Sequence, residues 1–145
     1  MKKFFVLTAT IASLALTMTN AEAAEPLELQ KVMKDLGKNM QLITDAISRE
    51  DWALVESTSP LIADHPQPPV SEKLRIMSFM GSNMGKFKDF DLQTHEAASE
   101  MAAAAKEKDG QKVISAFQKT QLSCLGCHQS FRAGFVEHFY GKPAN

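Results

Sequence analysis

Two cysteines and a histidine near the carboxyl end of the chain form its most informative motif. Cys124 and Cys127 are the only cysteines in the sequence, and His128 follows the second directly. Cys-x-x-Cys-His is the pattern that attaches a c-type haem, because the two thiols form thioethers with the porphyrin and the imidazole binds the iron. Positions i, i+3 and i+4 share one face of an α-helix, so a helical segment would direct all three side chains to one side. The motif therefore predicts one covalently attached haem c.

Three other interpretations of a cysteine pair fit this sequence less well. A structural zinc site uses four ligands, usually from two such pairs, and the chain has no second Cys or His pair. A thioredoxin-type dithiol lies at the N-terminus of a helix within a βαβ unit, and no strand-like pattern surrounds this motif. A disulfide between residues so close in sequence closes a very small loop and contributes little stability.

The amino-terminal residues have the pattern of a secretory signal peptide. The basic pair Lys2-Lys3 precedes an apolar run over residues 4–18, and Ala21-Glu22-Ala23 is a small-residue cleavage site. The apolar run is shorter than the ~20 residues that span a bilayer. We therefore expect residues 1–23 to be removed on export to the periplasm, and residues 24–145 to form one domain without a stable membrane anchor.

The charge of the chain argues against nucleic acid as a partner. Its formal net charge is −1 with histidine neutral, and loss of residues 1–23 removes two lysines and one glutamate, which makes it more negative. Proteins that bind nucleic acid need a basic face to neutralise phosphates.

Apolar residues recur at helical spacing in the first half of the mature chain. The segment 27–49 carries a heptad-like seam made of Leu29, Met33, Leu36, Met40, Ile43 and Ile47. Asp51 is a suitable cap for a second helix, which Pro60 should kink or divide. The proline-rich segment 65–69 should then form an extended linker.

The second half of the chain continues the helical pattern. Residues 71–91 suggest a short helix, which could continue into an alanine-rich helix over 92–108. A turn at Lys108-Asp109-Gly110 precedes the last helix, whose seam comprises Val113, Phe117, Thr120, Cys124, Cys127, Phe131 and Phe135. Nothing in the mature sequence alternates with period two, so we predict an all-α, antiparallel four-helix bundle with the haem-attachment motif on its C-terminal helix.

This organisation resembles the class II cytochromes c, which comprise cytochrome c′ and its low-spin relatives. The block 124–132 matches the family pattern of Cys-x-x-Cys-His followed by an aromatic and a basic residue, and the block 32–40 is similar to the distal wall of the haem pocket. The segment 66–91 departs from the family, because it is compact and rich in methionine. The resemblance implies that His128 is the proximal iron ligand and that Phe131 and Arg132 lie near the haem.

The resemblance also places Met33 opposite the iron. A thioether at that position would give six-coordinate, low-spin iron and a higher reduction potential, whereas a purely apolar neighbour would leave the iron five-coordinate. Other methionines compete for this role, since Met is common in helical cores: Met40, Met77, Met80 and Met84. A second imidazole is a further alternative, from His65, His95 or His138, although a capping or surface role is more common for such residues.

Two functions follow from these alternatives. With Met33 bound to iron, the chain would be a periplasmic one-electron carrier whose partners are other redox proteins. With His128 alone, it would be a cytochrome c′-like protein that binds NO or CO. No pair of acid–base groups accompanies the motif, so we do not expect an enzyme. A homodimer through the first two helices, around Trp52 and Val55, is possible by resemblance to the family.

Overall fold

The computed structural model describes residues 27–141, so the predicted signal peptide, residues 1–23, lies outside the described residues. Every regular element in the described part is helical, as the sequence predicted, and none is a strand. The elements are α1 (Glu28–Ser48), α2 (Trp52–Thr58), α3 (Pro60–Ala63), α4 (Val70–Met80), the 3-10 turn η1 (Gly81–Asn83), α5 (Met84–Lys106), α6 (Gly110–Cys127), the π-helical segment η2 (His128–Arg132) and α7 (Ala133–Tyr140). This order is consistent with a four-helix bundle in which α2 and α3 together form the second helix.

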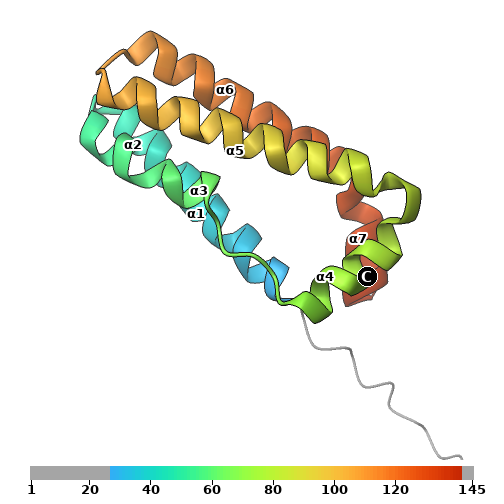
Figure 1. Cartoon of the computed structure of the whole chain (residues 1–145). Coiled ribbons are helices and arrows are strands. Elements are labelled where there is room, and N and C mark those ends of the chain that lie inside the picture. The colour runs from blue at the N-terminus through green and yellow to red at the C-terminus, as the bar shows by residue number, and fades with distance from the viewer. Residues whose placement is uncertain (1–26, 142–145) are drawn as a thin grey trace, which may run out of the picture.

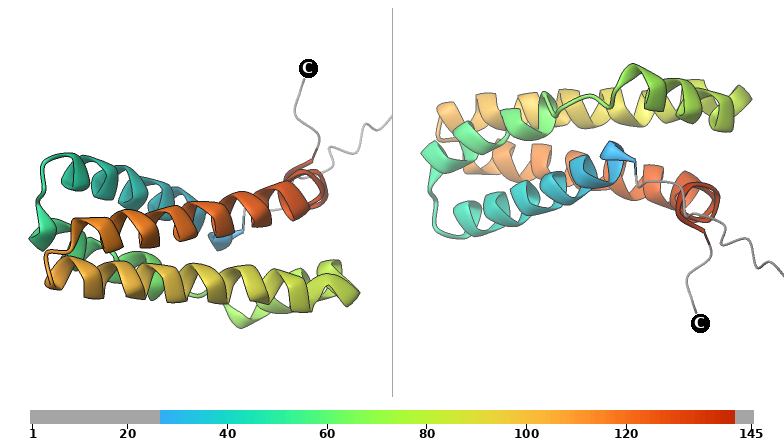
Figure 2. Two further views of the ribbon diagram at one scale, coloured as in Figure 1. Left: turned by 90° about the horizontal axis from the view of Figure 1, so that it is seen from above. Right: turned by 90° about the horizontal axis from the view of Figure 1, so that it is seen from below.

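Two layers of helices make up the fold (Figure 1). The long helices α5 and α6 lie side by side, and α1 lies with α2 and α3 against them. The short helices α4 and α7 close the end of the molecule opposite the α5–α6 turn, as both views of Figure 2 also show. Within residues 27–141, no helix is both long enough and apolar enough to cross a bilayer.

Local sequence signals explain where several helices begin. Asp51 caps α2, because its Oδ1 accepts a hydrogen bond from the backbone N–H of Leu54 at 3.1 Å. Asp109 caps α6 in the same way, through the N–H of Lys112 at 3.1 Å. Pro60 is the first residue of α3 and divides the second helix after Thr58. The cap at Asp51, the break at Pro60 and the turn before α6 were predicted from the sequence and are confirmed.

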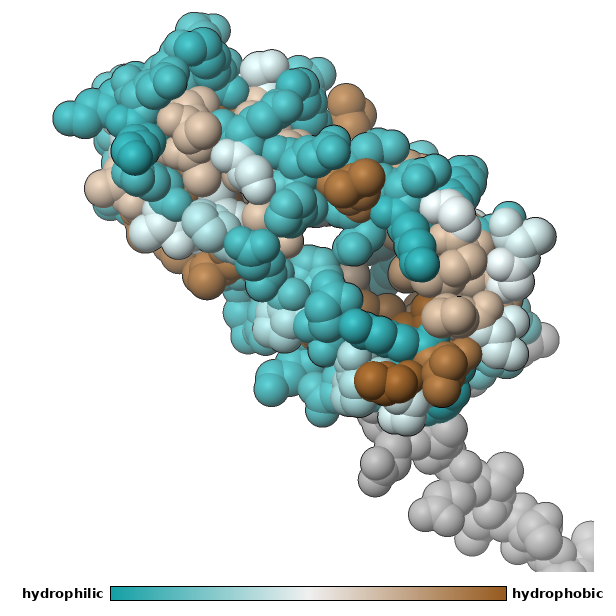
Figure 3. All heavy atoms as spheres, in the orientation of Figure 1, coloured by the Kyte–Doolittle hydropathy of each residue, from teal (hydrophilic) through white to brown (hydrophobic). Residues whose placement is uncertain are grey.

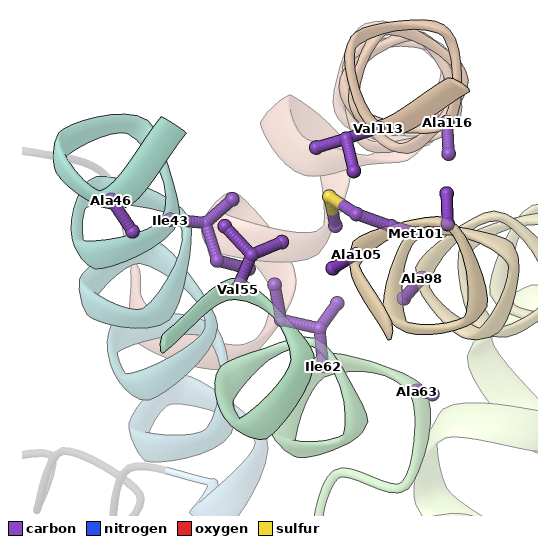
Figure 4. Packing of buried hydrophobic residues seen from close by; sticks show 11 residues of the cluster. Ile43, Ala46, Val55, Ile62, Ala63, Ala98, Met101, Ala105, Val113 and Ala116 are labelled. Atoms are coloured by element: carbon purple, nitrogen blue, oxygen red, sulfur yellow. The ribbon is translucent and has the colours of Figure 1, made fainter. Parts of the chain in front are cut away.

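A main cluster of buried apolar residues holds α1, α2, α3, α5 and α6 together at the end of the bundle that contains the α5–α6 turn (Figure 4). Its largest fully enclosed side chains are Ile43, Ile62, Met101, Val55 and Val113. Alanines on α5 fill the space between them and allow α6 to approach closely, as the alanine-rich composition of this segment predicted.

A terminal cluster joins α1, α4 and α7 at the opposite end. It is built on four buried residues, Leu27, Ile76, Met80 and Phe139, with a surround of partly buried aromatic rings. Glu72 of α4 adds a polar link, because its Oε1 accepts a hydrogen bond from the N–H of Glu28 at 2.8 Å. The residue before α1, Leu27, offers no side-chain cap, so this carboxylate stabilises the positive end of α1 in its place.

The third predicted segment, 71–91, has its boundary in a different place. The chain breaks after Met80, where Gly81 has a φ of +50°, and α5 starts at Met84 and passes residue 91 without interruption. The continuation of this segment into the alanine-rich helix is therefore confirmed, but the break lies earlier, after Met80. The face of α4 also differs from the expected one, since Leu74 and Met77 are exposed and the buried residues are Ile76 and Met80.

Two further positions differ from the expected seams. Met33 is 41% exposed, whereas its neighbour Val32 is buried, so the buried stripe of α1 turns away from the strict heptad at this end. Val55 is fully buried in the main cluster, and Trp52 lies over Gly110, where a Cβ would be 3.0 Å from the indole ring. Val55 therefore belongs to the core and Trp52 is partly buried against it, and a homodimer through the first two helices stays a prediction.

Two methionines, one fully buried in the main cluster and one exposed on α4, allow a test of this packing. Met101→Ala should lower the free energy of unfolding by about 2–5 kcal/mol, because it empties a fully buried site. Met77→Ala is the matched control and should change it by less than ~0.5 kcal/mol, since that side chain is 47% exposed. Urea unfolding followed by circular dichroism measures both, and equal losses would contradict this description of the core.

Candidate functional site

The Cys-x-x-Cys-His motif lies where α6 passes between the main and terminal clusters. Cys124 and Cys127 occupy the last turn of α6, and His128 begins the π-helical segment η2. Both cysteines are partly buried and free of a disulfide. The seam residues of α6 are buried or partly buried, and Cys124 and Cys127 are among the partly buried ones, whereas His128 is exposed. The predicted inward direction therefore holds for the two thiols.

Helix α5 holds the motif in place through a close approach at Gly126. A Cβ added to Gly126 would be only 2.6 Å from Cε1 of Phe90, so the central glycine of the motif is needed for the two helices to pack. One turn earlier, the hydroxyl groups of Thr94 and Ser123 are hydrogen-bonded at 2.7 Å. These contacts fix which residues of α5 face Cys124 and Cys127.

The two thiols are poor nucleophiles in this setting. The pKa of Cys127 is raised to about 11, mainly by burial and to a smaller extent by the neighbouring Cys124 and Asp91. Burial also raises the pKa of Cys124, partly offset by a hydrogen bond from Thr94. A reactive dithiol would instead have lowered pKa values at a helix N-terminus. This pair lies at the C-terminal end of α6, so the structure argues against the thioredoxin-type interpretation.

The pKa of His128 is lowered, which favours the neutral imidazole, and the neutral form is the one that binds a metal. Burial lowers its pKa, and the positive charge of Arg132 lowers it further. Arg132 is therefore close enough to act on the imidazole, as the resemblance implied. Both residues belong to η2, and π-helical turns of this kind are frequent at functional sites and at helix bends. Figure 2 shows the bend, with α7 viewed end-on beside α6.

A hollow lies beside the motif, between α5 and the linker that joins α3 to α4 (Figure 3). It has a volume of about 550 Å³ and is lined from the linker side by His65 and Gln67 and from α5 by Asp91 and His95, among others. One lining residue, Asp91, is close enough to Cys127 for its charge to raise the pKa of that thiol.

Phe131 packs in the aromatic part of the terminal cluster, on the same side as the motif. Its ring meets Phe87 and Phe90 edge-on, with centroids 5.8 and 6.3 Å apart, and Lys86 Nζ lies 5.8 Å from its centroid. Phe135 belongs to the same cluster. Both residues are core residues, and Phe131 in addition shares Phe90 with Gly126 of the motif.

The competing methionines and histidines have distinct environments. Met80 and Met84 pack in the terminal cluster, Met40 packs against the main cluster, and Met77 faces solvent. His138 stacks on Phe79 with ring centroids 4.4 Å apart, and His95 Nδ1 donates to the carbonyl of Ala63 at 2.9 Å. The 41% exposure of Met33 leaves its role as an iron ligand a prediction.

His65 is bound on both sides of its ring. Nδ1 lies 3.2 Å from the carbonyl oxygen of Pro66, and Nε2 lies 3.1 Å from Oδ1 of Asp91. Both partners accept hydrogen bonds, so neither nitrogen is turned toward a metal, and the structure favours the polar, non-ligand interpretation of this residue.

The donor set fits a covalently attached haem. Two partly buried thiols without a disulfide and an imidazole whose pKa is lowered lie within about one turn of helix. Among residues 27–141, no group of three or more His, Cys, Asp or Glu side chains is arranged to hold a metal ion. In a haem-loaded chain, Cys124 and Cys127 would hold the porphyrin and His128 the iron.

Sequence reasoning missed the partners of the motif on α5. A glycine inside a helical pattern, such as Gly126, can signal a close approach, but the sequence does not show that Phe90 is the residue that approaches. The π-helical turn at residues 128–132 and the His65–Asp91 pair have no local sequence signal, because each depends on tertiary contacts.

The comparisons with known proteins agree with these features. A family model described as Cytochrome C′ matches residues 80–132, as the resemblance to the class II cytochromes c predicted. The match includes the whole motif, Phe131 and Arg132 but not α1, so Met33 lies outside it. No curated protein matches the chain. The match favours a c-type cytochrome and implies a covalently bound haem c.

Gly126→Ala tests the contact that holds the motif. The new methyl group must displace the Phe90 ring, so we expect a loss of about 1–3 kcal/mol in the free energy of unfolding. Gly85→Ala, on the same pair of helices but with nothing within 4 Å of the new Cβ, is the matched control and should be neutral or stabilising by up to ~1 kcal/mol. If both variants behave alike in urea unfolding, the close approach is not as described.

The His65–Asp91 pair should give the stability a characteristic pH dependence. The hydrogen bond to Asp91 raises the pKa of His65 above its ordinary 6.5, so this contribution is complete below pH 6.5 and is lost as pH rises through the raised value. The pKa of Asp91 is lowered from 3.8 by the same bond, so its contribution is present above pH 3.8 and is lost as pH falls through the lowered value.

Asp91→Asn should therefore be most destabilising between these limits. We expect a loss of about 0.5–1 kcal/mol near pH 5.5, because the carboxylate is more than half exposed, and almost none near pH 9. Urea unfolding at both pH values measures it, and a pH-independent loss would show that the pair is not formed.

Proposed function

We propose that this protein is an exported, monohaem c-type cytochrome that carries one electron between redox proteins of the periplasm. Thioethers from Cys124 and Cys127 hold the haem, and His128 binds the iron. The haem supplies a reversible Fe(III)/Fe(II) couple. The helices form an antiparallel four-helix bundle around it, with the attachment motif on the C-terminal helix. The signal-like residues 1–23 support export, and the protein is not an enzyme.

One observation carries this proposal: two partly buried thiols without a disulfide, followed directly by an imidazole whose pKa is lowered, lie between two apolar clusters. The clusters pack the helices on both sides of the motif and leave a hollow beside it. Apolar surroundings keep water from an iron centre and raise its reduction potential. Phe131 forms part of the wall, and Arg132 adds a positive charge on the side of His128.

Met33 is proposed as the sixth ligand of the iron. It lies on α1, the helix that the resemblance places opposite the motif, and its side chain is not committed to the core. A thioether favours Fe(II) and keeps the iron geometry similar in both oxidation states, which suits electron transfer.

Binding of NO or CO to five-coordinate iron is the second candidate function. Two observations favour it: the matching family model is that of Cytochrome C′, and the match does not extend to Met33. In this case Met33 would only shield the distal side, and small gases would bind where the thioether would otherwise bind.

Optical spectra of the haem-loaded protein separate the two functions. If Met33 binds iron, the ferric protein should show low-spin bands and the weak charge-transfer band of Met–haem ligation at the red end of the visible spectrum, and the ferrous protein should react slowly with CO. Met33→Ala should lose these features and bind CO promptly. Met40→Ala is the matched control on the same helix and should keep them.

Two other spectral results would change the assignment of Met33 as the iron ligand. A high-spin wild type that binds CO at once would exclude the six-coordinate carrier and support the gas-binding function. Loss of the low-spin bands in Met40→Ala alone would move the ligand to Met40.

A further inference from the structure

The His65–Asp91 pair connects the proline-rich linker with the helix that holds the motif. Its two partners come from positions 26 residues apart, and the imidazole is only 11% exposed. The partners of the ring are a carbonyl and a carboxylate, which only accept hydrogen bonds. Both contacts are satisfied at once only when both ring nitrogens carry a proton, so the geometry favours the imidazolium.

The carboxylate of this pair lies beside the attachment motif. On α5, Phe90 packs against Gly126, and the next residue, Asp91, acts electrostatically on Cys127. A porphyrin held by Cys127 would therefore have the charge of Asp91 nearby, and protonation of His65 would compensate that charge.

We propose that His65 and Asp91 together tune the reduction potential of the haem. Protonation of His65 compensates the negative charge of Asp91, and loss of that proton leaves it uncompensated. This inference rests on the proposed function. When His65 is protonated, the pair is neutral overall. When His65 is neutral, the bare carboxylate stabilises Fe(III), and the potential falls.

Electrons and protons balance in this scheme. Reduction adds one electron, supplied by a redox-protein partner, to the iron. Where His65 is partly deprotonated, its imidazole takes up a proton from solvent and compensates that added charge. By linkage, the pKa of His65 must then be higher in the ferrous than in the ferric protein.

Other charged groups near the His65–Asp91 pair also contribute to the reduction potential, so their contribution must be distinguished from that of the pair. The hollow also contains Asp64, Lys88 and His95, and Cys127 faces Asp91 from α6. Of these, His95 is the only other imidazole, and its charge also acts on Asp91. His95 hydrogen-bonds a carbonyl at the end of α3, and its side chain is 48% exposed, so it serves as the matched control. Porphyrin carboxylates would titrate in every variant and cancel in the comparison.

The test is the midpoint potential of the haem-loaded protein between about pH 5 and pH 9, measured with spectra at each pH. In the wild type, the potential should fall as pH rises through the pKa of His65, with a slope below the limit of ~59 mV per pH unit for one proton and one electron. In His65→Asn, this fall should be absent and the potential should stay at the lower level. Asp91→Asn should raise the high-pH level, and His95→Asn should keep the fall with pH, since His95 acts on Asp91 only through its charge.

A second measurement covers the case in which His65→Asn does not fold. NMR titration of His65 in the wild type should give a higher pKa in the ferrous than in the ferric protein, and equal values would overturn the inference. A reversible couple that is independent of pH, or whose fall persists in His65→Asn, would also overturn it and leave the carrier function intact. Absence of covalent haem would contradict the proposed function and this inference together.

Discussion

The close packing of α5 against α6 is the constraint on which the rest of this structure depends. Phe90 fits against Gly126 because the glycine has no side chain, and the Thr94–Ser123 hydrogen bond fixes the register one turn away. Together these contacts decide that Cys124 and Cys127 face the interior and that Asp91 faces Cys127. The chemistry of the motif is thus set by a helix that contributes none of its residues.

Two separate apolar clusters, with a hollow between them, distinguish this fold from a uniformly filled bundle. The main cluster joins the helices near the α5–α6 turn, and the terminal cluster joins α1, α4 and α7 at the other end. The π-helical turn at residues 128–132 bends the chain so that α7 closes that end. The same turn carries His128 and Arg132, so it both bends the chain and places the charge of Arg132 where it lowers the pKa of the imidazole.

The sequence predicted the features that depend on local patterns and missed those that depend on contacts. Helical spacing, the cap at Asp51, the turn that contains Asp109 and the break at Pro60 are local, and all were confirmed. The exposed Met77 and the start of α5 at Met84 were not anticipated, because the methionine-rich segment has apolar residues on two faces and only packing selects one. The motif predicted its own inward direction, but Phe90, Asp91 and His65 come from other elements and leave no signal near it.

The intact mass of the exported protein, measured after denaturation, tests the central claim most directly. The account predicts a chain that begins near Ala24 and is heavier by one haem, because thioethers survive denaturation and extraction. Replacement of both Cys124 and Cys127 by alanine should abolish the added mass. A wild-type chain with the apo mass and two free or mutually bonded thiols would contradict the account.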